Sequence, residues 1–153
     1  MRFLADEMLG RLARYLRMVG CDTADLRGAT DSEVAERARL EGRRLLTRDR
    51  RRAARIDGAI LLTEVEISRQ VQQLHRQCPE LRWTPRPVRC TLCNGVLNPV
   101  ALSEREALAA PERLRRSDQP IWRCPNCGHI YWIGSHLDRL AADLARWIGE
   151  VQA

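Results

Sequence analysis

Residues 2–20 read RFLADEMLGRLARYLRMVG, and this run sets the architecture of the N-terminal half of the chain. Arg2–Ala5 is a short, mostly apolar segment that ends at the acidic Asp6. Residues 8–19 then repeat leucine, alanine and valine at helical spacing, and Gly20 stands where a helix is expected to end. The pattern predicts a β-strand followed by an α-helix, which is the first half of a βαβ unit.

The same alternation of short apolar runs and helical patterns continues as far as Gln77. Further strands are expected over 22–26, 44–47 and 59–62, and further helices over 30–41, 49–55 and 66–77. The second helix opens on a capping box formed by Thr30 and Glu33. Strands that alternate with helices predict an α/β domain of three layers with a small parallel sheet and right-handed crossovers. The chain contains no Gly-x-Gly-x-x-Gly motif, so nothing in it supports dinucleotide binding.

All 26 basic residues of the 153-residue chain are arginine, and 20 acidic residues leave a formal net charge of +6. The absence of lysine excludes chemistry that needs one, such as a Schiff base or a P-loop. The basic balance favours a polyanionic partner, although the use of arginine alone can equally reflect the base composition of a genome. No apolar stretch is long enough to span a membrane, and Asp6 interrupts the N-terminal apolar run before a signal peptide develops. We therefore expect a cytoplasmic protein.

The composition changes at Pro79, and further prolines at positions 85 and 87 indicate a connector. We expect three parts: an α/β domain over 1–83, a zinc ribbon over 84–136, and a C-terminal helix over 137–153. This helix carries an apolar stripe that predicts packing back onto the α/β domain. Its Trp147 is expected in that contact rather than as a stacking platform for bases.

Two Cys-x-x-Cys turns, formed by Cys90, Cys93, Cys124 and Cys127, are each followed within two residues by glycine. Two cysteines three residues apart on a tight turn can present both sulfurs to one ion. A pair of such turns completes the tetrahedral shell of four thiolates that structural zinc prefers. In a cytoplasmic chain this pattern favours zinc over disulfides or redox turns. Because the four thiolates leave no open coordination position, we expect a structural ion and no need for His129 as a ligand.

Three aromatic residues, Trp122, Tyr131 and Trp132, flank the second turn beside Arg123. Aromatic rings interleaved with arginine can stack on unpaired bases. They can also form the small core of the ribbon, and this second interpretation is favoured.

Three aspartates follow the predicted strands: Asp6 ends the first, Asp31 opens the helix after the second, and Asp49 follows the third. Loops after parallel strands meet at the carboxyl edge of a sheet, where open α/β sheets bind ligands. Converging carboxylates repel one another unless a cation neutralises them, and their hard oxygens suit Mg²⁺ or Mn²⁺. Asp6, Asp31 and Asp49 are therefore candidate metal ligands and catalytic residues. Each also stands at a helix start, where an acid alone can serve as a cap.

Arginines surround the predicted acidic edge. The candidates for contacts to a phosphate backbone are Arg11, Arg14, Arg48 and Arg50. The alternative for each is a solvated helix face. Arg17, three residues after Arg14, is expected on the exposed side of the first helix.

The segment DEMLGRLAR (6–14) resembles the start of the Mut-seven C-terminal RNase domain. The segments DSE (31–33) and LLTRDR (45–50), and the cysteine turns that follow, resemble later parts of the same domain. The resemblance extends over residues 2–136. It implies a PIN-like nuclease fold joined to a zinc ribbon.

The resemblance also implies metal-dependent RNA cleavage, with the three aspartates named above as metal ligands. Related PIN-like domains often carry another acid shortly after the position of the third aspartate. Here Arg51 and Arg52 stand in that region, so the chain departs from the family pattern. Glu7 and Glu33 are the acids that could compensate.

Together these observations predict a metal-dependent ribonuclease that hydrolyses RNA phosphodiester bonds through a carboxylate-bound Mg²⁺ or Mn²⁺ ion. A metal-bound water is the expected nucleophile, and a structural Zn²⁺ is expected in the ribbon. RNA is the expected partner, and the sequence identifies no protein partner. The alternative is a non-catalytic RNA- or protein-binding zinc-ribbon protein whose acids are helix caps. A third interpretation, a toxin of the toxin–antitoxin type, shares the fold but not usually the ribbon.

Overall fold

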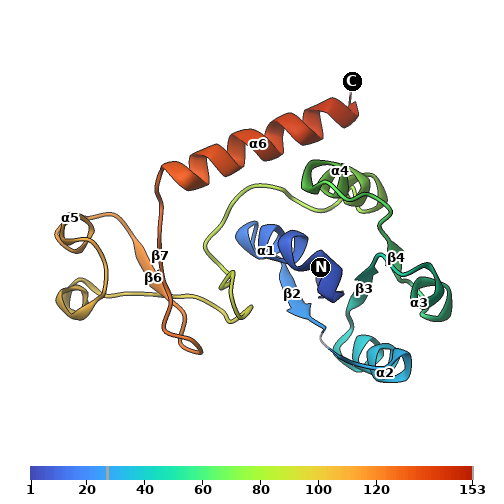
Figure 1. Ribbon diagram of the computed structural model, residues 1–153. Helices are drawn as coiled ribbons and strands as arrows, with labels where there is room; N and C mark the ends of the chain where they lie inside the picture. Colours follow the sequence, from blue (N-terminus) through green and yellow to red (C-terminus); the bar gives the residue numbers. More distant parts are fainter. Residues whose placement is uncertain (27, 153) are drawn as a thin grey trace.

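The computed structural model describes residues 1–26 and 28–152, without the side chains of residues 136 and 150–152. Figure 1 shows an α/β part formed by the first half of the chain and a smaller part built around short strands. A long C-terminal helix runs from the smaller part back to the α/β part (Figure 1).

Four strands form the sheet of the α/β part: β1 (Arg2–Ala5), β2 (Asp22–Asp25), β3 (Arg44–Thr47) and β4 (Ile60–Leu61). All their pairings are parallel, and their order is β2-β1-β3-β4. In this register Leu4 lies between Ala24 and Leu45. The chain forms β2 on one side of β1 and β3 on the other, so the strand order switches direction between β1 and β3. The prediction of an α/β fold with a small parallel sheet is confirmed.

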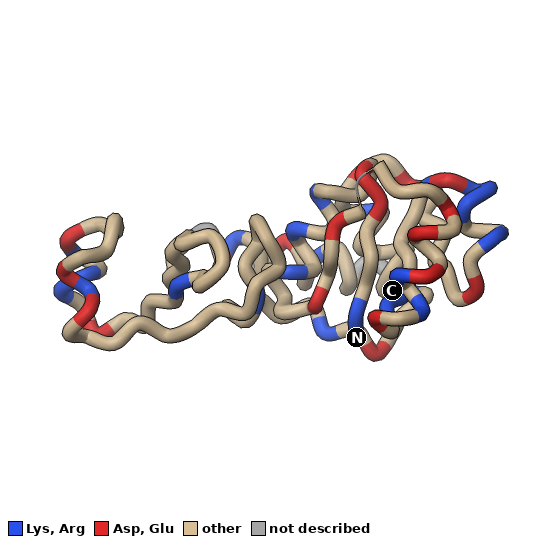
Figure 2. Tube along the Cα trace, turned by 90° about the horizontal axis from the view of Figure 1, so that it is seen from below, with Lys and Arg blue, Asp and Glu red and all other residues tan. Residues whose placement is uncertain are grey.

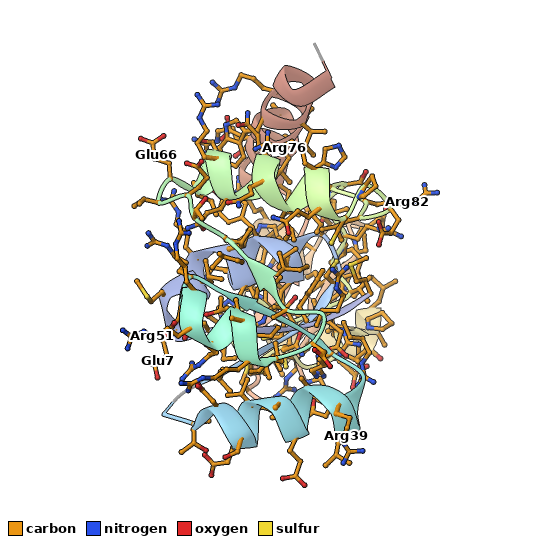
Figure 3. The ribbon with its side chains drawn as sticks, turned by 90° about the vertical axis from the view of Figure 1, so that its right-hand side faces the viewer. Glu7, Arg39, Arg51, Glu66, Arg76 and Arg82 are labelled. Atoms are coloured by element: carbon orange, nitrogen blue, oxygen red, sulfur yellow. The ribbon has the colours of Figure 1, made fainter. Side chains whose placement is uncertain are left out.

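The helices of this part are α1 (Gly10–Met18), α2 (Asp31–Glu41), α3 (Arg50–Arg55) and α4 (Ile67–Gln77). Successive residues of a strand point to opposite faces of a sheet, and the core divides accordingly. Phe3 packs with Leu12 of α1 and Leu74 of α4, whereas its neighbour Leu4 packs with Val34 of α2. Figure 3 shows helices above and below the sheet, which makes three layers.

Local hydrogen bonds explain where the helices begin. Thr30 and Glu33 form the predicted capping box before α2, and Gly42 ends this helix at φ 59°. The helix predicted over 8–19 differs, because it begins as the 3₁₀ helix η1 (Glu7–Leu9) and becomes α-helical only at Gly10. The carboxylate of Asp6 accepts a hydrogen bond from the backbone N–H of Glu7, which starts η1 directly at the end of β1.

The C-terminal helix α6 (Ser135–Gln152) packs against α4. Leu140 and Leu144 enter the same core as α1 and α4. Gln72 donates a hydrogen bond to the carbonyl of Trp147 at 2.9 Å, and the Trp147 ring lies 5.8 Å from that of Tyr15. The helix is therefore held against the α/β part by both apolar and polar contacts. Within the described residues, no helix has the length and apolar character needed to cross a membrane.

The smaller part contains the antiparallel strands β5 (Asn98–Pro99), β6 (Ile121–Arg123) and β7 (Ile130–Trp132). Between β5 and β6 the chain forms the 3₁₀ helix η2 (Leu102–Ala107) and the short helix α5 (Glu112–Arg115). Figure 2 shows this segment at the end of the molecule away from the α/β part. Both acidic and basic positions occur in both parts (Figure 2).

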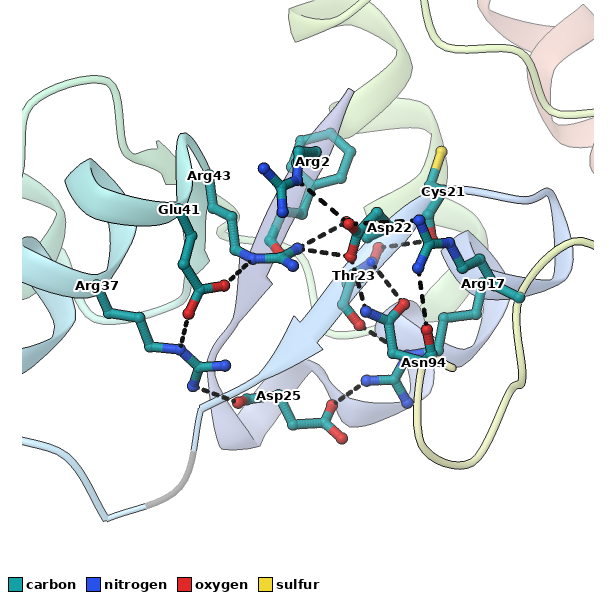
Figure 4. A network of polar contacts seen from close by, with 12 residues as sticks. Arg2, Arg17, Cys21, Asp22, Thr23, Asp25, Arg37, Glu41, Arg43 and Asn94 are labelled. Atoms are coloured by element: carbon teal, nitrogen blue, oxygen red, sulfur yellow. Dashed lines mark hydrogen bonds and ion pairs between the residues drawn. The ribbon is translucent and has the colours of Figure 1, made fainter. Parts of the chain in front are cut away.

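Arg17 joins the two parts, and its predicted exposure is wrong. Its side chain is 4% exposed, and Nε donates to the carbonyl of Thr23 at 2.7 Å. One terminal nitrogen donates to the carbonyl of Thr91 at 3.1 Å, and the other pairs with Asp25 at 2.7 Å (Figure 4). A helix turns about 100° per residue, so three-residue steps drift around it and carry Arg17 inward from the exposed Arg14.

A second set of contacts at the same junction centres on Asp22 and Asn94. The side chain of Asn94 accepts from the N–H of Thr23 at 2.9 Å and donates to Asp22 at 2.7 Å (Figure 4). Burial opposes ionisation of Asp22, but hydrogen bonds from Arg43 and Asn94 outweigh it and lower the pKa of Asp22 to about 2. The first cysteine turn is thus attached to the edge strand β2 by directed polar bonds.

Candidate functional site

Asp6 is held rigidly at the carboxyl end of β1. Its residue is 8% exposed, and its N–H donates to the carbonyl of Leu46 in the neighbouring strand at 3.0 Å. The hydroxyl of Thr47 donates to one carboxylate oxygen at 2.7 Å, and the N–H of Glu7 donates to the other at 2.7 Å. Asp6 therefore lies where the strand order switches direction, the place at which open α/β sheets bind ligands.

Asp49 follows β3 and caps α3. Its carboxylate accepts from the N–H groups of Arg51 at 2.8 Å and Arg52 at 3.1 Å. Its own N–H donates to the Thr47 hydroxyl at 3.0 Å, and that hydroxyl in turn donates to Asp6. Thr47 thus links the first and third predicted aspartates, a role that nothing in the sequence pattern signalled.

Asp31, the first residue of α2, is bound by two arginines of α3. Arg52 Nε donates to it at 2.8 Å and Arg55 at 2.9 Å, and these hydrogen bonds lower the pKa of Asp31. Arg52 also reaches Asp6, with 3.5 Å between a guanidinium nitrogen and the carboxylate. The bond to Asp31, opposed by burial and aided by the charges of Asp6 and Asp31, raises the pKa of Arg52.

The three aspartates share an edge but do not form a compact ligand set. Among the described residues, the four ribbon cysteines form a group of potential ligands whose donor atoms all lie within 4.8 Å, and the aspartates do not. Asp6 and Asp31 are connected through the Arg52 guanidinium, and Asp6 and Asp49 through the Thr47 hydroxyl. The neutralising charge at this edge is therefore an arginine of the chain.

An open pocket of about 350 Å³ adjoins Asp6 and is also lined by Glu7 and Asp25. Glu7 accepts from the N–H of Gly28 at 2.7 Å, and Asp25 is paired with Arg17. Figure 3 shows Glu7 at the same edge of the α/β part as the start of α3. Asp25 was not among the predicted site residues, although its place as the last residue of β2 puts it at the same edge as Asp6.

Three of the arginines predicted to contact phosphate, Arg11, Arg48 and Arg50, lie within a few residues of Asp6 or Asp49, and Arg14 lies one turn further along α1. Arg11, Arg14 and Arg50 are exposed, and Arg48 is half-buried. The buried Nε of Arg48 has no hydrogen-bond partner in the described part of the chain. Arg11 lies in the first turn of α1 and Arg48 and Arg50 flank Asp49, so an anion bound beside the aspartates can be met by guanidinium groups.

The four predicted cysteines come together in the ribbon. The sulfurs of Cys90 and Cys127 are 3.5 Å apart, and those of Cys93 and Cys124 are 3.4 Å apart. A Zn–S bond near 2.3 Å places the sulfurs of a regular tetrahedron about 3.8 Å apart. A Cβ atom on Gly95 would lie 3.0 Å from the Cys124 sulfur, so a side chain there would press on the cluster. Donor type and spacing both fit zinc.

Aromatic residues support this cluster. The Tyr131 hydroxyl lies 3.1 Å from the Cys90 sulfur and accepts from the N–H of Thr91 at 3.0 Å. Burial opposes ionisation of Cys90, but hydrogen bonds from Tyr131 and from backbone N–H groups of the turn lower its pKa to about 6. Trp122 and Tyr131 pack against Cys90 and Leu97, as expected for a ribbon core. His129 lies edge-on to Tyr131 and is not part of the ligand group.

Comparison with protein families agrees with this arrangement. The model of the family described as the Mut7-C RNAse domain matches residues 1–144, which is nearly the whole chain. No curated protein and no solved structure matches it. The match includes the parallel sheet with its acidic edge, the four-cysteine cluster and the first half of α6. The chain therefore belongs to the Mut7-C RNAse domain family.

Proposed function

We propose that this chain is a cytoplasmic ribonuclease that hydrolyses RNA phosphodiester bonds at the carboxyl edge of its parallel sheet. In this proposal Asp6, Asp31 and Asp49 bind Mg²⁺ or Mn²⁺. The family supplies the reaction class, since it is described as an RNase domain. The observation that carries the site is Asp6, a buried carboxylate fixed by Thr47 where the strand order switches, beside an open pocket.

The chemistry of the donors fits a divalent cation, but their present arrangement does not. Carboxylate oxygens are the ligands that Mg²⁺ and Mn²⁺ prefer, and a bound cation there would acidify a water and stabilise charge on the phosphate. In the described structure Arg52 already neutralises Asp6 and Asp31, and the three aspartates are too widely spaced to share one ion. Metal binding therefore requires these side chains to rearrange.

The arginines beside Asp6 and Asp49 indicate where RNA is expected to bind. Arg11 and Arg14 lie on α1, and Arg48 and Arg50 flank Asp49. Guanidinium groups bind phosphate through paired N–H donors and attract a polyanion over several ångströms. We expect RNA to lie along this edge, with its phosphates between the arginines and the acidic pocket. The ribbon zinc is structural in this proposal, because all four ligands come from the protein.

One observation favours a second candidate, a non-catalytic RNA- or protein-binding protein. Asp49 caps α3 through two backbone N–H groups, and Asp31 is occupied by two arginines. Acids used in this way stabilise helix starts without any reaction. In this case the chain binds RNA through its arginines and ribbon but leaves it intact.

Asp6→Asn separates the two candidates. We expect the wild-type chain to cleave single-stranded RNA with Mn²⁺, and Asp6→Asn to cleave it at least about a hundredfold more slowly, the lower range for losing a positioned catalytic group. Asp57→Asn is the matched control, because Asp57 is an exposed acid in the loop before β4, at the opposite edge of the sheet. The measurement is the initial rate on a labelled RNA with zinc-loaded proteins.

Equal rates for the wild type and Asp6→Asn would remove the nuclease assignment from this edge. RNA binding without cleavage in the wild type would favour the non-catalytic candidate.

A further inference from the structure

The guanidinium of Arg52 bridges two of the predicted metal ligands. Its Nε lies 2.8 Å from one oxygen of Asp31, and a terminal nitrogen lies 3.5 Å from Asp6. The other terminal nitrogen donates to the carbonyl of Ala29 at 3.3 Å. The Arg52 side chain is only 20% exposed, so it is packed between the loops at this edge and does not extend into solvent. A unit positive charge thus already lies in reach of both carboxylates.

The backbone fixes Arg52 in this place. Asp49 accepts a hydrogen bond from the Arg52 N–H, and this bond caps the start of α3 and fixes the backbone from which the Arg52 side chain extends. Arg55, one turn further along α3, differs in two ways: it pairs with Asp31 alone, and its side chain is 67% exposed. In the described ion pairs, Arg52 contacts both Asp6 and Asp31, whereas Arg55 contacts Asp31.

We propose that Arg52 is an intramolecular counter-ion that competes with the divalent cation for Asp6 and Asp31. This inference rests on the proposed function, and it concerns the regulation of cation binding at the same site. Two carboxylates that share a guanidinium have little net charge left to attract a second cation. A divalent ion can bind them only when the Arg52 side chain leaves, and leaving breaks its bonds to Asp31 and Ala29.

When a divalent ion displaces Arg52 from the carboxylates, the guanidinium group becomes available to bind phosphate. Arg52 stands on α3 between Asp49 and the α2 start, so a guanidinium that leaves the carboxylates remains beside the edge where phosphates are expected. A phosphate can then replace the carboxylates as its partner. Metal binding and phosphate binding at this edge are thereby coupled through one side chain.

Mn²⁺ titration of the full zinc-loaded chain tests the proposal, with free Mn²⁺ followed by electron paramagnetic resonance. We expect Arg52→Gln to bind Mn²⁺ about tenfold more tightly than the wild type, the order for removing one charge beside carboxylates at intermediate dielectric. Arg55→Gln is the matched control, since it removes the same charge from the same helix without contacting Asp6. It should change the affinity less than about threefold. Asp6→Asn added to Arg52→Gln should abolish the gain.

The proposal fails if Arg52→Gln binds Mn²⁺ no more tightly than the wild type, or if the gain survives Asp6→Asn. Circular dichroism and zinc content report whether the variants fold. Should Arg52→Gln not fold, Arg52→Met removes the same charge and keeps an apolar stem of similar length, and it must bind Mn²⁺ more tightly than the wild type. Unchanged Mn²⁺ affinity together with Asp6-dependent RNA cleavage overturns this inference alone. Equal cleavage by the wild type and Asp6→Asn overturns the proposed function instead.

Discussion

Replacing Cys90 with serine is expected to release zinc and unfold the segment from 88 to 135. Cys90 is fully buried, and its sulfur lies 3.5 Å from that of Cys127. Structural zinc contributes on the order of 10 kcal/mol or more to small modules of this kind. The β5–β7 sheet has few buried apolar residues beyond the cluster, so it has little else to hold it together.

Two measurements report this effect: zinc per chain by elemental analysis, and hydrogen exchange of backbone amides over 88–135. We expect about one zinc per wild-type chain and much less in Cys90→Ser. Cys21→Ser is the control, because Cys21 lies outside the ligand group and should leave the zinc content unchanged. A wild-type chain that is stably folded without metal would contradict the zinc assignment.

Arg17→Ala is expected to destabilise the zinc-loaded chain by about 2–4 kcal/mol, because it removes charged hydrogen bonds to two backbone carbonyls and an ion pair whose acid is 34% exposed. The substitution leaves Asp25 without its cation, and it leaves the carbonyls of Thr23 and Thr91 without their donors. The lost bonds join α1, β2 and the first cysteine turn. The effect should therefore extend to both parts of the molecule, and urea unfolding of the zinc-loaded proteins measures it.

Arg14→Ala provides the comparison, because Arg14 is exposed on the same helix one turn earlier. It should change the free energy of unfolding by no more than about 0.5 kcal/mol. If Arg17→Ala unfolds at the same urea concentration as Arg14→Ala, the junction contributes nothing to stability and our account of Arg17 is wrong.

The features that could be predicted well from the sequence are those determined by residues close to one another along the chain. The strand expected over 44–47 is β3, and the capping box of Thr30 and Glu33 forms both of its hydrogen bonds. The cysteine turns meet as their spacing indicates, since a tight turn leaves two sulfurs few other directions. The capping box and each single cysteine turn depend on groups within a few residues of one another, whereas the meeting of the two turns was predicted from the shared preference of four thiolates for one ion.

The features that the sequence did not reveal depend on contacts between distant segments. The sequence pattern predicts only that Thr47 is the last residue of a strand. The pairing of β3 with β1 is what brings its hydroxyl to Asp6. Arg17 reads as part of an exposed stripe until the ribbon supplies carbonyl partners 74 residues away. Arg52 reads as one of a solvated run, and it becomes a bridge only when α2 and α3 meet at the same edge.

A divalent cation is expected to bind at Asp6, at the carboxyl edge of the sheet. Anomalous scattering from Mn²⁺-soaked crystals of the wild type and of Arg52→Gln locates such an ion. We predict a manganese peak within bonding distance of the Asp6 carboxylate, about 2.2 Å, and stronger occupancy in Arg52→Gln. Saturated crystals of both proteins that show no manganese beside Asp6 would contradict the claim.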